Sequence, residues 1–368
     1  MDTGDDLSYR IALSLVPGVG FIHAKSLLTY FGSAKAIFKA REKTLMKVPG
    51  IGSITAGNIR NQNVLNRAEA EVEFIRRHRI KTFFYQDGDY PSRLKSCEDA
   101  PLILFAHGKV DFSRNKMIAV VGTRHATEYG RKFCDELIAG MSAREGYCVV
   151  SGLAYGIDIA AHKACLKHGV PTIGVLGHGL DQIYPSLHRP VAEKMLEDGG
   201  LVTDFLSHTE IERQNFLRRN RIIAGLTDAV VIVESAERGG ALVTADIAWS
   251  YNRDVFAVPG RATDPYSKGC NELIRQNKAS LISNLDDLEY FMSWQPEVDR
   301  PAVVQSRLFS DLTPDEQKIV GSIQGKALSI DDICQQVTMP AGQVSSLLLG
   351  LEFRGIVLSL PGKMYKLA

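Results

Sequence analysis

The residues best suited to bind a charged ligand lie in one short run, residues 214–225, with the sequence QNFLRRNRIIAG. The run combines an aromatic residue, three arginines and an asparagine: Phe216, Arg218, Arg219, Arg221 and Asn220. Guanidinium groups bind phosphate oxygens at two points, and a ring gives a base a surface on which to stack. We therefore expect this run to form a helix that binds phosphates and bases.

Glycine-rich loops follow several predicted strands and could bring backbone N–H groups to the same ligand. They occupy residues 122–124, 151–158, 177–181, 234–240 and 259–261. In the first of them Gly122 permits close approach of the backbone, Thr123 offers a hydroxyl and Arg124 a guanidinium. The helix after this loop would direct its N-terminus at the same anion.

The loop at residues 234–240 resembles the first in its composition, because Arg238, Gly239 and Gly240 stand just before a predicted helix. Ligands of open parallel sheets bind beyond the carboxyl ends of the strands, where all these loops should lie. Several such loops on one edge predict an extended ligand that carries phosphates.

Alternating short apolar runs and amphipathic segments organise the middle of the chain. The expected strands are residues 117–121, 148–150, 172–176, 201–203, 229–233, 255–258 and 280–282, and the expected helices include residues 131–143, 157–168, 191–196 and 242–250. Nearly continuous apolar strands alternating with helices indicate parallel pairing. Residues 81–295 are therefore predicted to form a Rossmann-like, doubly wound α/β domain with a mostly parallel sheet.

Residues 1–80 read as entirely helical and contain a repeated turn, Val-Pro-Gly-x-Gly, at residues 16–20 and 48–52. Each copy precedes a predicted helix, at residues 22–30 and 54–60, which is typical of a helix-hairpin-helix (SAM-like) domain. Such turns can hold a phosphate on backbone N–H groups. They can equally be structural turns that touch no ligand, and the sequence leaves both interpretations open.

Residues 296–310 are a predicted linker with prolines at 296 and 301. Residues 311–368 then read as three helices followed by a two-stranded hairpin, the layout of a winged-helix domain. Thr313 and Ser329 are expected helix N-caps. The third helix has Arg354 near its end and few other basic residues, which weakens a role in reading a DNA groove. Protein contact or simple packing is an equally good interpretation.

Bulk composition excludes several classes of protein. The 368 residues carry 43 Lys and Arg against 42 Asp and Glu, a net charge of +1, so any nucleic-acid site must be a local patch. The six cysteines are dispersed, as in a reducing compartment. An acidic start and the lack of a long apolar run favour a cytoplasmic protein with no membrane association.

Familiar catalytic patterns are also missing. The first strand of the middle domain is not followed by Gly-x-Gly-x-x-Gly, and neither a Walker loop nor a Gly-x-Ser-x-Gly turn occurs. His162, Cys165 and His168 have spacing compatible with zinc but lack a second ligand pair, and we expect His162 to pair with Asp158 instead. We expect no catalytic residue, no metal and no cofactor.

The combined motifs resemble the DNA-processing protein A (DprA, or Smf) family across nearly the whole chain. The resemblance is carried by VGTR at 121–124, SGLAYGID at 151–158, VLGHGLD at 175–181, RNRIIAGL at 219–226, GALVTA at 240–245 and VPG at 258–260. Three positions depart from the family pattern: Thr123 replaces serine, Tyr155 replaces a basic residue, and Asp204 begins a loop without the usual Glu-x-Pro.

The resemblance implies a protein without enzymatic activity that binds incoming single-stranded DNA in natural transformation, protects it and loads RecA recombinase onto it. It also implies a homodimer, whose surface family analogy would place near residues 273–282. Residues carried over by position are those that would hold a phosphate (Gly122, Thr123, Arg124), those that would line a basic pocket (Phe216, Arg218, Arg219, Asn220, Arg221) and those that would close it (Ser151, Gly152, Tyr155).

Two other functions were weighed against this one. A related Rossmann-like class hydrolyses nucleoside monophosphates and carries Pro-Gly-Gly-x-Gly-Thr-x-x-Glu, but residues 238–246 lack its proline, third glycine and glutamate. A transcription regulator that uses the winged helix to bind duplex DNA is the weakest alternative, because the third helix is poor in basic residues.

Overall fold

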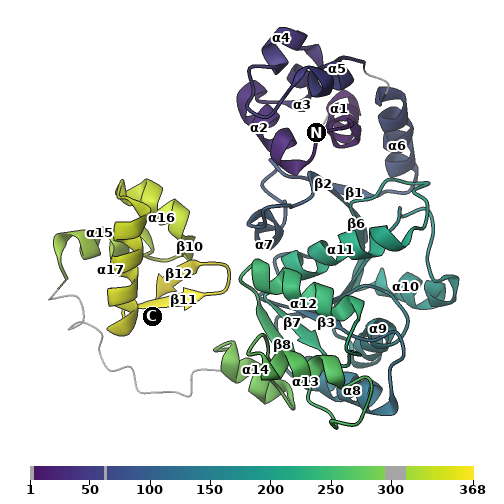
Figure 1. Cartoon of the computed structure of the whole chain (residues 1–368), viewed down its shortest axis with the longest axis vertical. Coiled ribbons are helices and arrows are strands. Elements are labelled where there is room, and N and C mark those ends of the chain that lie inside the picture. Colours follow the sequence, from purple (N-terminus) through teal and green to yellow (C-terminus); the bar gives the residue numbers. More distant parts are fainter. Residues whose placement is uncertain (1–3, 62–63, 295–311) are drawn as a thin grey trace.

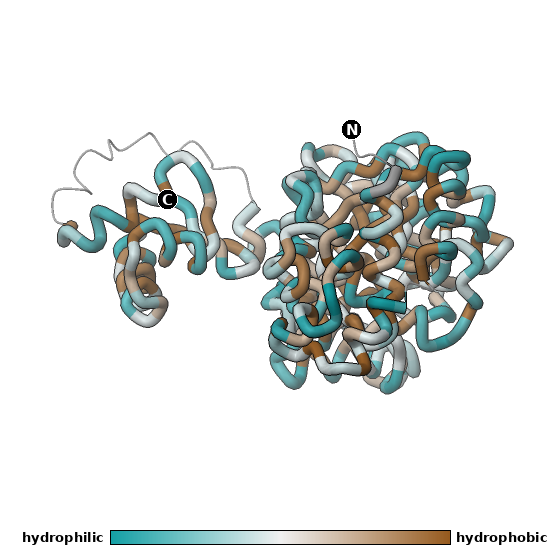
Figure 2. The backbone as a smooth tube through the Cα atoms, turned by 90° about the horizontal axis from the view of Figure 1, so that it is seen from above, coloured by the Kyte–Doolittle hydropathy of each residue, from teal (hydrophilic) through white to brown (hydrophobic). Residues whose placement is uncertain are grey.

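The computed structural model describes residues 4–61, 64–294 and 312–368, so the predicted linker at residues 296–310 lies outside the described residues. Figure 1 shows three groups of elements: helices at the N-terminal end, a large central sheet with helices, and a small C-terminal group. Apolar segments run through the interior of the larger body, with hydrophilic segments around them (Figure 2).

The central sheet has nine strands in the order β1-β2-β6-β5-β4-β3-β7-β8-β9. Its parallel part consists of β3 (Lys116–Val121), β4 (Tyr147–Ser151), β5 (Thr172–Val175), β6 (Gly199–Thr203), β7 (Ala229–Ile232), β8 (Asp254–Ala257) and β9 (Ser280–Leu281). The chain winds outward from β3 to β6, then returns to place β7 on the other side of β3. The predicted doubly wound, mostly parallel fold is confirmed.

Two strands that the sequence analysis missed extend this sheet. β1 (Lys81–Phe84) pairs antiparallel with β2 (Ile103–Gly108), and β2 pairs antiparallel with β6. Both are short apolar runs with no strand–helix alternation around them, and such runs cannot be assigned by periodicity alone.

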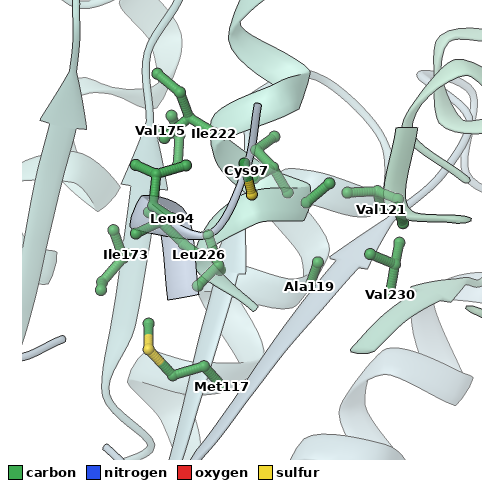
Figure 3. Packing of buried hydrophobic residues seen from close by; sticks show 14 of the residues in the cluster. Leu94, Cys97, Met117, Ala119, Val121, Ile173, Val175, Ile222, Leu226 and Val230 are labelled. Carbon is green, nitrogen blue, oxygen red and sulfur yellow. The ribbon is translucent and has the colours of Figure 1, made fainter. Parts of the chain in front are cut away.

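Helices cover both faces of the sheet. α8 (Glu128–Ser142), α9 (Ile157–His168) and α14 (Leu285–Phe291) pack on one face, and α10 (Arg189–Met195) covers β5 and β6. The other face carries α7 (Ser92–Lys95), α11 (Arg213–Leu226), α12 (Gly240–Ser250) and α13 (Lys268–Arg275). Figure 3 shows Ile222 and Leu226 of α11 among Leu94, Ile173 and Val175. The arginine-rich run thus forms the predicted helix, and one face of that helix belongs to the core.

The N-terminal helices are α1 (Gly4–Leu15), α2 (Phe21–Phe31), α3 (Ala34–Lys39), α4 (Glu42–Leu45), α5 (Ser53–Asn61) and α6 (Leu65–Arg77). Gly18 and Gly50, at matching places in the two repeated turns, have φ of +83° and +82°, a conformation that favours glycine. The core of this group also contains Phe84, Ile103 and Phe105 from β1 and β2. The apolar core therefore continues across residue 80. The domain boundary expected at that residue remains a prediction.

The C-terminal group contains α15 (Pro314–Ser322), α16 (Ile330–Val337) and α17 (Ala341–Phe353), then the hairpin β11 (Val357–Leu360) and β12 (Met364–Leu367). A short strand β10 (Leu328–Ser329), which was not predicted, joins the hairpin. The Thr313 side chain accepts from Glu316 N and the Ser329 side chain from Asp332 N, so both expected N-caps are confirmed. This group has its own core, as a winged-helix domain requires.

No helix in the described ranges has the length and apolar character needed to cross a membrane. The six cysteines are free thiols, and all but Cys334 are buried. Within the same ranges no three His, Cys, Asp or Glu side chains gather as metal ligands.

Candidate nucleic-acid interface

A cavity of about 550 Å³ opens beside β3 and β7, the two neighbouring strands between which the winding direction reverses. We call it the switch-point pocket. Its wall includes nine of the residues expected to bind DNA: Gly122, Thr123, Arg124, Phe216, Arg219, Asn220, Arg238, Gly239 and Gly240. The crevice at such a reversal is where open α/β sheets bind their ligands.

Backbone hydrogen bonds hold the first two loops and the loop after β7 together. Thr123 N donates to Glu234 O at 2.7 Å, and Ile157 N donates to Thr123 O at 3.1 Å. A Cβ on Gly122 would lie 2.5 Å from Ile157 Cγ1. Gly156 has a φ of +80°, and a Cβ there would lie 2.0 Å from Thr123 O. Glycine is therefore required at both positions by close contact between the loops, independently of any ligand.

The N-terminus of α8 does not face an open anion site, which corrects the expectation from the sequence. Glu234, 3% exposed, accepts from Thr127 N at 2.9 Å and from the Thr127 hydroxyl. A carboxylate of the protein thus already occupies the place where a phosphate was expected. The N-terminus of α8 therefore gives Arg124 no help in binding an anion.

Three arginines at the mouth of the pocket are exposed and carry no charge partner. Arg124, Arg213 and Arg238 all line the cavity, and none of them forms an ion pair or side-chain hydrogen bond within the described ranges. Asp158 is the one carboxylate among the described lining residues, and it is 7% exposed. The mouth is therefore locally basic in a chain whose net charge is only +1.

Arg219 plays a different part from the exposed arginines, because it is 3% exposed and points into the protein. Its Nη1 donates to Gly152 O at 2.6 Å and also to Val175 O. Burial lowers the pKa of Arg219 to about 10, while Asp158 opposes that shift, so the guanidinium stays charged at neutral pH. Burial raises the pKa of Asp158, and Arg219 opposes it. Arg219 lines the inner wall of the pocket and holds the second loop in place through its hydrogen bond to Gly152 O.

Three second-loop residues that were expected to close the pocket, Ser151, Gly152 and Tyr155, lie outside its wall. Ser151 is fully buried and donates to Val120 O at 2.6 Å. A Cβ on Gly152 would lie 2.4 Å from Arg219 Nη1, so glycine makes room for the guanidinium. Tyr155 is 46% exposed with its ring edge-on to His188, and it remains available to a ligand outside the cavity.

Aromatic rings flank the guanidinium groups. Phe216 lines the pocket and packs against Tyr184, with ring centroids 5.7 Å apart. His125 and Tyr266 also line it and stack at 6.1 Å with an interplanar angle of 29°. The sequence analysis missed both of these residues, and it missed Arg213 because Arg213 precedes the run by one position. The position of Arg213 one turn before Leu217 could have indicated a shared face.

Arg218 and Arg221 do not line the switch-point pocket, which corrects the expectation of a single basic pocket. Both face a second cavity on the opposite flank of α11. Arg221 forms an ion pair with Asp204 and donates to Asp99 O. Arg218 is exposed and lies over the Phe205 ring, 5.7 Å from its centroid. Of the three arginines of the run, two therefore lie on the flank that faces the second cavity, and Arg219 points into the interior.

A buried histidine lies behind the inner wall. His162 Nδ1 is 2.8 Å from Thr172 Oγ1, so its partner is not Asp158 as expected. Burial lowers the pKa of His162 to about 3, with the Arg219 charge acting in the same direction. His162 is therefore neutral at physiological pH and supports β5 from α9.

The comparisons with known proteins agree with this geometry. Residues 81–293 match the model of the family described as DNA recombination-mediator protein A, and residues 306–363 match the DprA winged helix domain. Protein Smf from Synechocystis is 31% identical over 98% of both chains, and Protein Smf from Escherichia coli is 35% identical over 76% of this chain and 75% of its own.

Two solved structures share the fold. DNA processing protein A from Streptococcus pneumoniae has a TM-score of 0.64 and 29% identity, covering 78% of this chain and 98% of its own. The protein of the same name from Helicobacter pylori, solved to explain its single-stranded DNA binding mode, has a TM-score of 0.53 and 26% identity over 58% and 96%. The winged-helix match extends the likeness beyond the α/β domain. The chain belongs to the DNA recombination-mediator protein A family.

Proposed function

We propose that this protein binds single-stranded DNA in the switch-point pocket, protects it during natural transformation, and loads RecA recombinase onto it. The observation that carries the proposal is the pocket mouth, where Arg124, Arg213 and Arg238 have no charge partner among the described residues and the rings of Phe216 and Tyr266 lie close by. Free guanidinium groups can bind the backbone of a strand while rings stack on its bases, which gives binding that tolerates any sequence.

The proposed activity is binding without catalysis. Asp158 is the sole carboxylate among the described lining residues, and it is buried beside the Arg219 charge. A hydrolase of the nucleoside monophosphate class would need a carboxylate free to activate water or protonate a leaving base. This arrangement favours the DNA-binding interpretation over the hydrolase.

The direct test compares a 20-nucleotide oligo-dT with a duplex of equal length by fluorescence anisotropy. The single strand should bind more tightly, and Arg124→Ala and Arg238→Ala should each weaken its binding about tenfold. Each variant should also reduce the salt slope of log affinity by about 0.7 for each lost phosphate contact. Arg76→Ala, which removes an exposed charge from α6 away from the pocket, is the matched control. Unchanged affinity in both pocket variants would refute the proposal.

RecA loading needs a separate measurement because DNA binding alone does not produce it. Single-stranded DNA coated with single-strand-binding protein resists RecA filament formation, and a loader should shorten the lag before RecA hydrolyses ATP. We expect the full-length chain to shorten that lag and Arg124→Ala to do so poorly. Equal lags with and without the protein would remove this part of the proposal.

We further propose a homodimer formed around β9, the edge strand of the sheet. Trp249, Leu281, Tyr290 and Phe291 are 66%, 43%, 68% and 50% exposed. Three of them, Trp249, Leu281 and Phe291, line one shallow cavity beside β9. An apolar patch beside an unpaired strand edge favours a second copy that covers both. Light scattering should give twice the chain mass for the native protein and a monomer for Leu281→Arg, and a native monomer would contradict the dimer.

A further inference from the structure

The second cavity beside α11 has a volume of about 540 Å³ and lies between the N-terminal helices and the α/β domain. We call it the hairpin pocket, because Val19 and Gly20 of the first repeated turn form part of its wall. Phe21, Phe205 and Arg218 also line it. The proposed function gives the helix-hairpin-helix segment no role. This segment and the switch-point pocket lie on opposite sides of α11.

The wall of the hairpin pocket is held in place by contacts between the two parts of the chain. Arg67 of α6 donates through Nη2 to Ser207 O at 2.6 Å and through Nη1 to Glu71 at 2.8 Å. Glu71, 2% exposed, accepts from Ser207 N at 3.0 Å and from the Ser207 hydroxyl. The loop that carries Phe205 is therefore fixed to α6 before any ligand arrives.

Among the described arginines that line the hairpin pocket, two are paired with carboxylates and one is not. Arg67 pairs with Glu71, and Arg221 pairs with Asp204. Arg218 is exposed, forms no ion pair within the described ranges, and has the half-buried Phe205 ring beside it. A free guanidinium next to an accessible ring is the smallest unit that can hold a phosphate and stack the adjoining base.

An exposed ridge of α11 joins the two pockets. With 3.6 residues per turn, Arg213 and Leu217 lie on the helix face between Phe216, which faces the first pocket, and Arg218, which faces the second. Arg213, Gln214 and Leu217 are exposed, and none of them is an acid. The width of one helix, about 10 Å, separates the two cavities.

We propose that the hairpin pocket is a second nucleotide subsite, which takes a phosphate on Arg218 and a base against Phe205 from the strand already held in the switch-point pocket. The inference rests on the proposed function, since it concerns the continuation of the same polynucleotide. It gives the N-terminal helical segment a place in DNA binding through the wall it contributes, beside Val19 and Gly20. The pocket serves only strands long enough to cross α11.

The test measures the affinity of the full-length chain for oligo-dT of 4, 8, 12 and 20 nucleotides. Arg218→Ala and Phe205→Leu should weaken binding of the 20-mer about fivefold or more and leave the 4-mer unchanged. Phe205→Tyr keeps a ring and should restore the affinity for the 20-mer. The salt slope for the 20-mer should fall by about 0.7 in Arg218→Ala. Thermal unfolding of each variant checks that the loop remains folded.

The controls separate this inference from the proposed function. Arg124→Ala should weaken binding of oligo-dT of every length. Arg76 lies on the face of α6 opposite Arg67, and Arg76→Ala should leave the affinity for both the 4-mer and the 20-mer unchanged. If Arg124→Ala weakens binding but Arg218→Ala and Phe205→Leu leave the length series unchanged, the second subsite is refuted and the proposed function stands. If Arg124→Ala has no effect either, the switch-point pocket itself is wrong. Equal losses for the 4-mer and 20-mer in Arg218→Ala would also refute a subsite reached only by longer strands.

Discussion

On the side of α11 that faces the switch-point pocket, the arginines at the rim have no acidic partners in the part of the chain that the structure describes, whereas on the side that faces the hairpin pocket Arg221 is paired with Asp204. Between the two sides, Arg219 turns inward and bonds to backbone carbonyls. One short helix therefore has exposed arginines, one arginine in an ion pair and one that supports the second loop. The neighbours of an arginine, more than its presence in a basic run, decide which of these it does.

The strongest way to test this contrast is to remove the inward arginine. Arg219→Met leaves Asp158 buried without a compensating charge and removes the Arg219 hydrogen bonds to two carbonyls, so the α/β domain should lose about 3–5 kcal/mol of stability. Arg213→Met, on the exposed side, should change stability by about 0.5 kcal/mol or less. Urea unfolding followed by circular dichroism gives both values. Equal stabilities for the two variants would mean that Arg219 does not support the second loop.

The buried residues behind the pocket should also affect how the stability of the protein depends on pH. The folded-state pKa of His162 is about 3, below its ordinary value of 6.5, so the unfolded chain binds a proton that the folded chain does not. Its stabilising contribution is therefore complete above pH 6.5 and is lost as pH falls below that value, with a slope approaching about 1.4 kcal/mol per pH unit. His162→Gln should flatten the decline in unfolding free energy between pH 6.5 and 5. Parallel profiles for the two proteins would argue against this role.

The exposed side is tested by Arg213→Ala, which removes a free guanidinium from the ridge and should weaken binding of a 20-nucleotide oligo-dT about tenfold. Its thermal midpoint should stay at the native value because the exposed Arg213 side chain forms no ion pair or hydrogen bond with the described residues. Anisotropy and calorimetry on the same preparation make the two measurements. A fall in stability without a fall in affinity would reverse the assignment of the two sides.

A smaller effect should follow from releasing the paired arginine. Asp204→Asn removes the charge that holds Arg221, which then becomes available to a phosphate in the hairpin pocket. Affinity for the 20-mer should rise about threefold and the salt slope should steepen by about 0.7. The 4-mer serves as the control, and its affinity should not change. Weaker binding of the 20-mer would show that Arg221 acts only through its pair with Asp204.

Much of the fold could be predicted because it depends on patterns within short windows. The helix expected at residues 157–168 matches α9, and each strand expected in the parallel sheet is present within a residue or two. The antiparallel strands β1 and β2 escaped because two short apolar runs separated by 18 residues give no period from which to assign them. Their pairing depends on a long-range contact, because β2 joins the sheet beside β6.

The candidate site was predicted less well than the fold, because residue type does not reveal the direction of a side chain. Arg219 has Ile222, Ile223 and Leu226 at helical spacings of three, four and seven, a signal that it shares the buried face. The pairing of Arg221 with Asp204 and the hydrogen bonds from Thr127, the N-cap of α8, to Glu234 depend on which strands are neighbours, and the sequence could not supply that. Contact of the individual residues with DNA remains a prediction.

The shared core of the N-terminal helices and the first two strands has a consequence for dissecting this protein. Cutting the chain after residue 80 would expose Phe84, Ile103 and Phe105 to water along a newly bare flank of the sheet. A shortened protein of that kind would be prone to stick to itself, and lost DNA binding in it would say little about the removed segment. Single side-chain changes in the intact chain are the sound route to learning what the helices contribute.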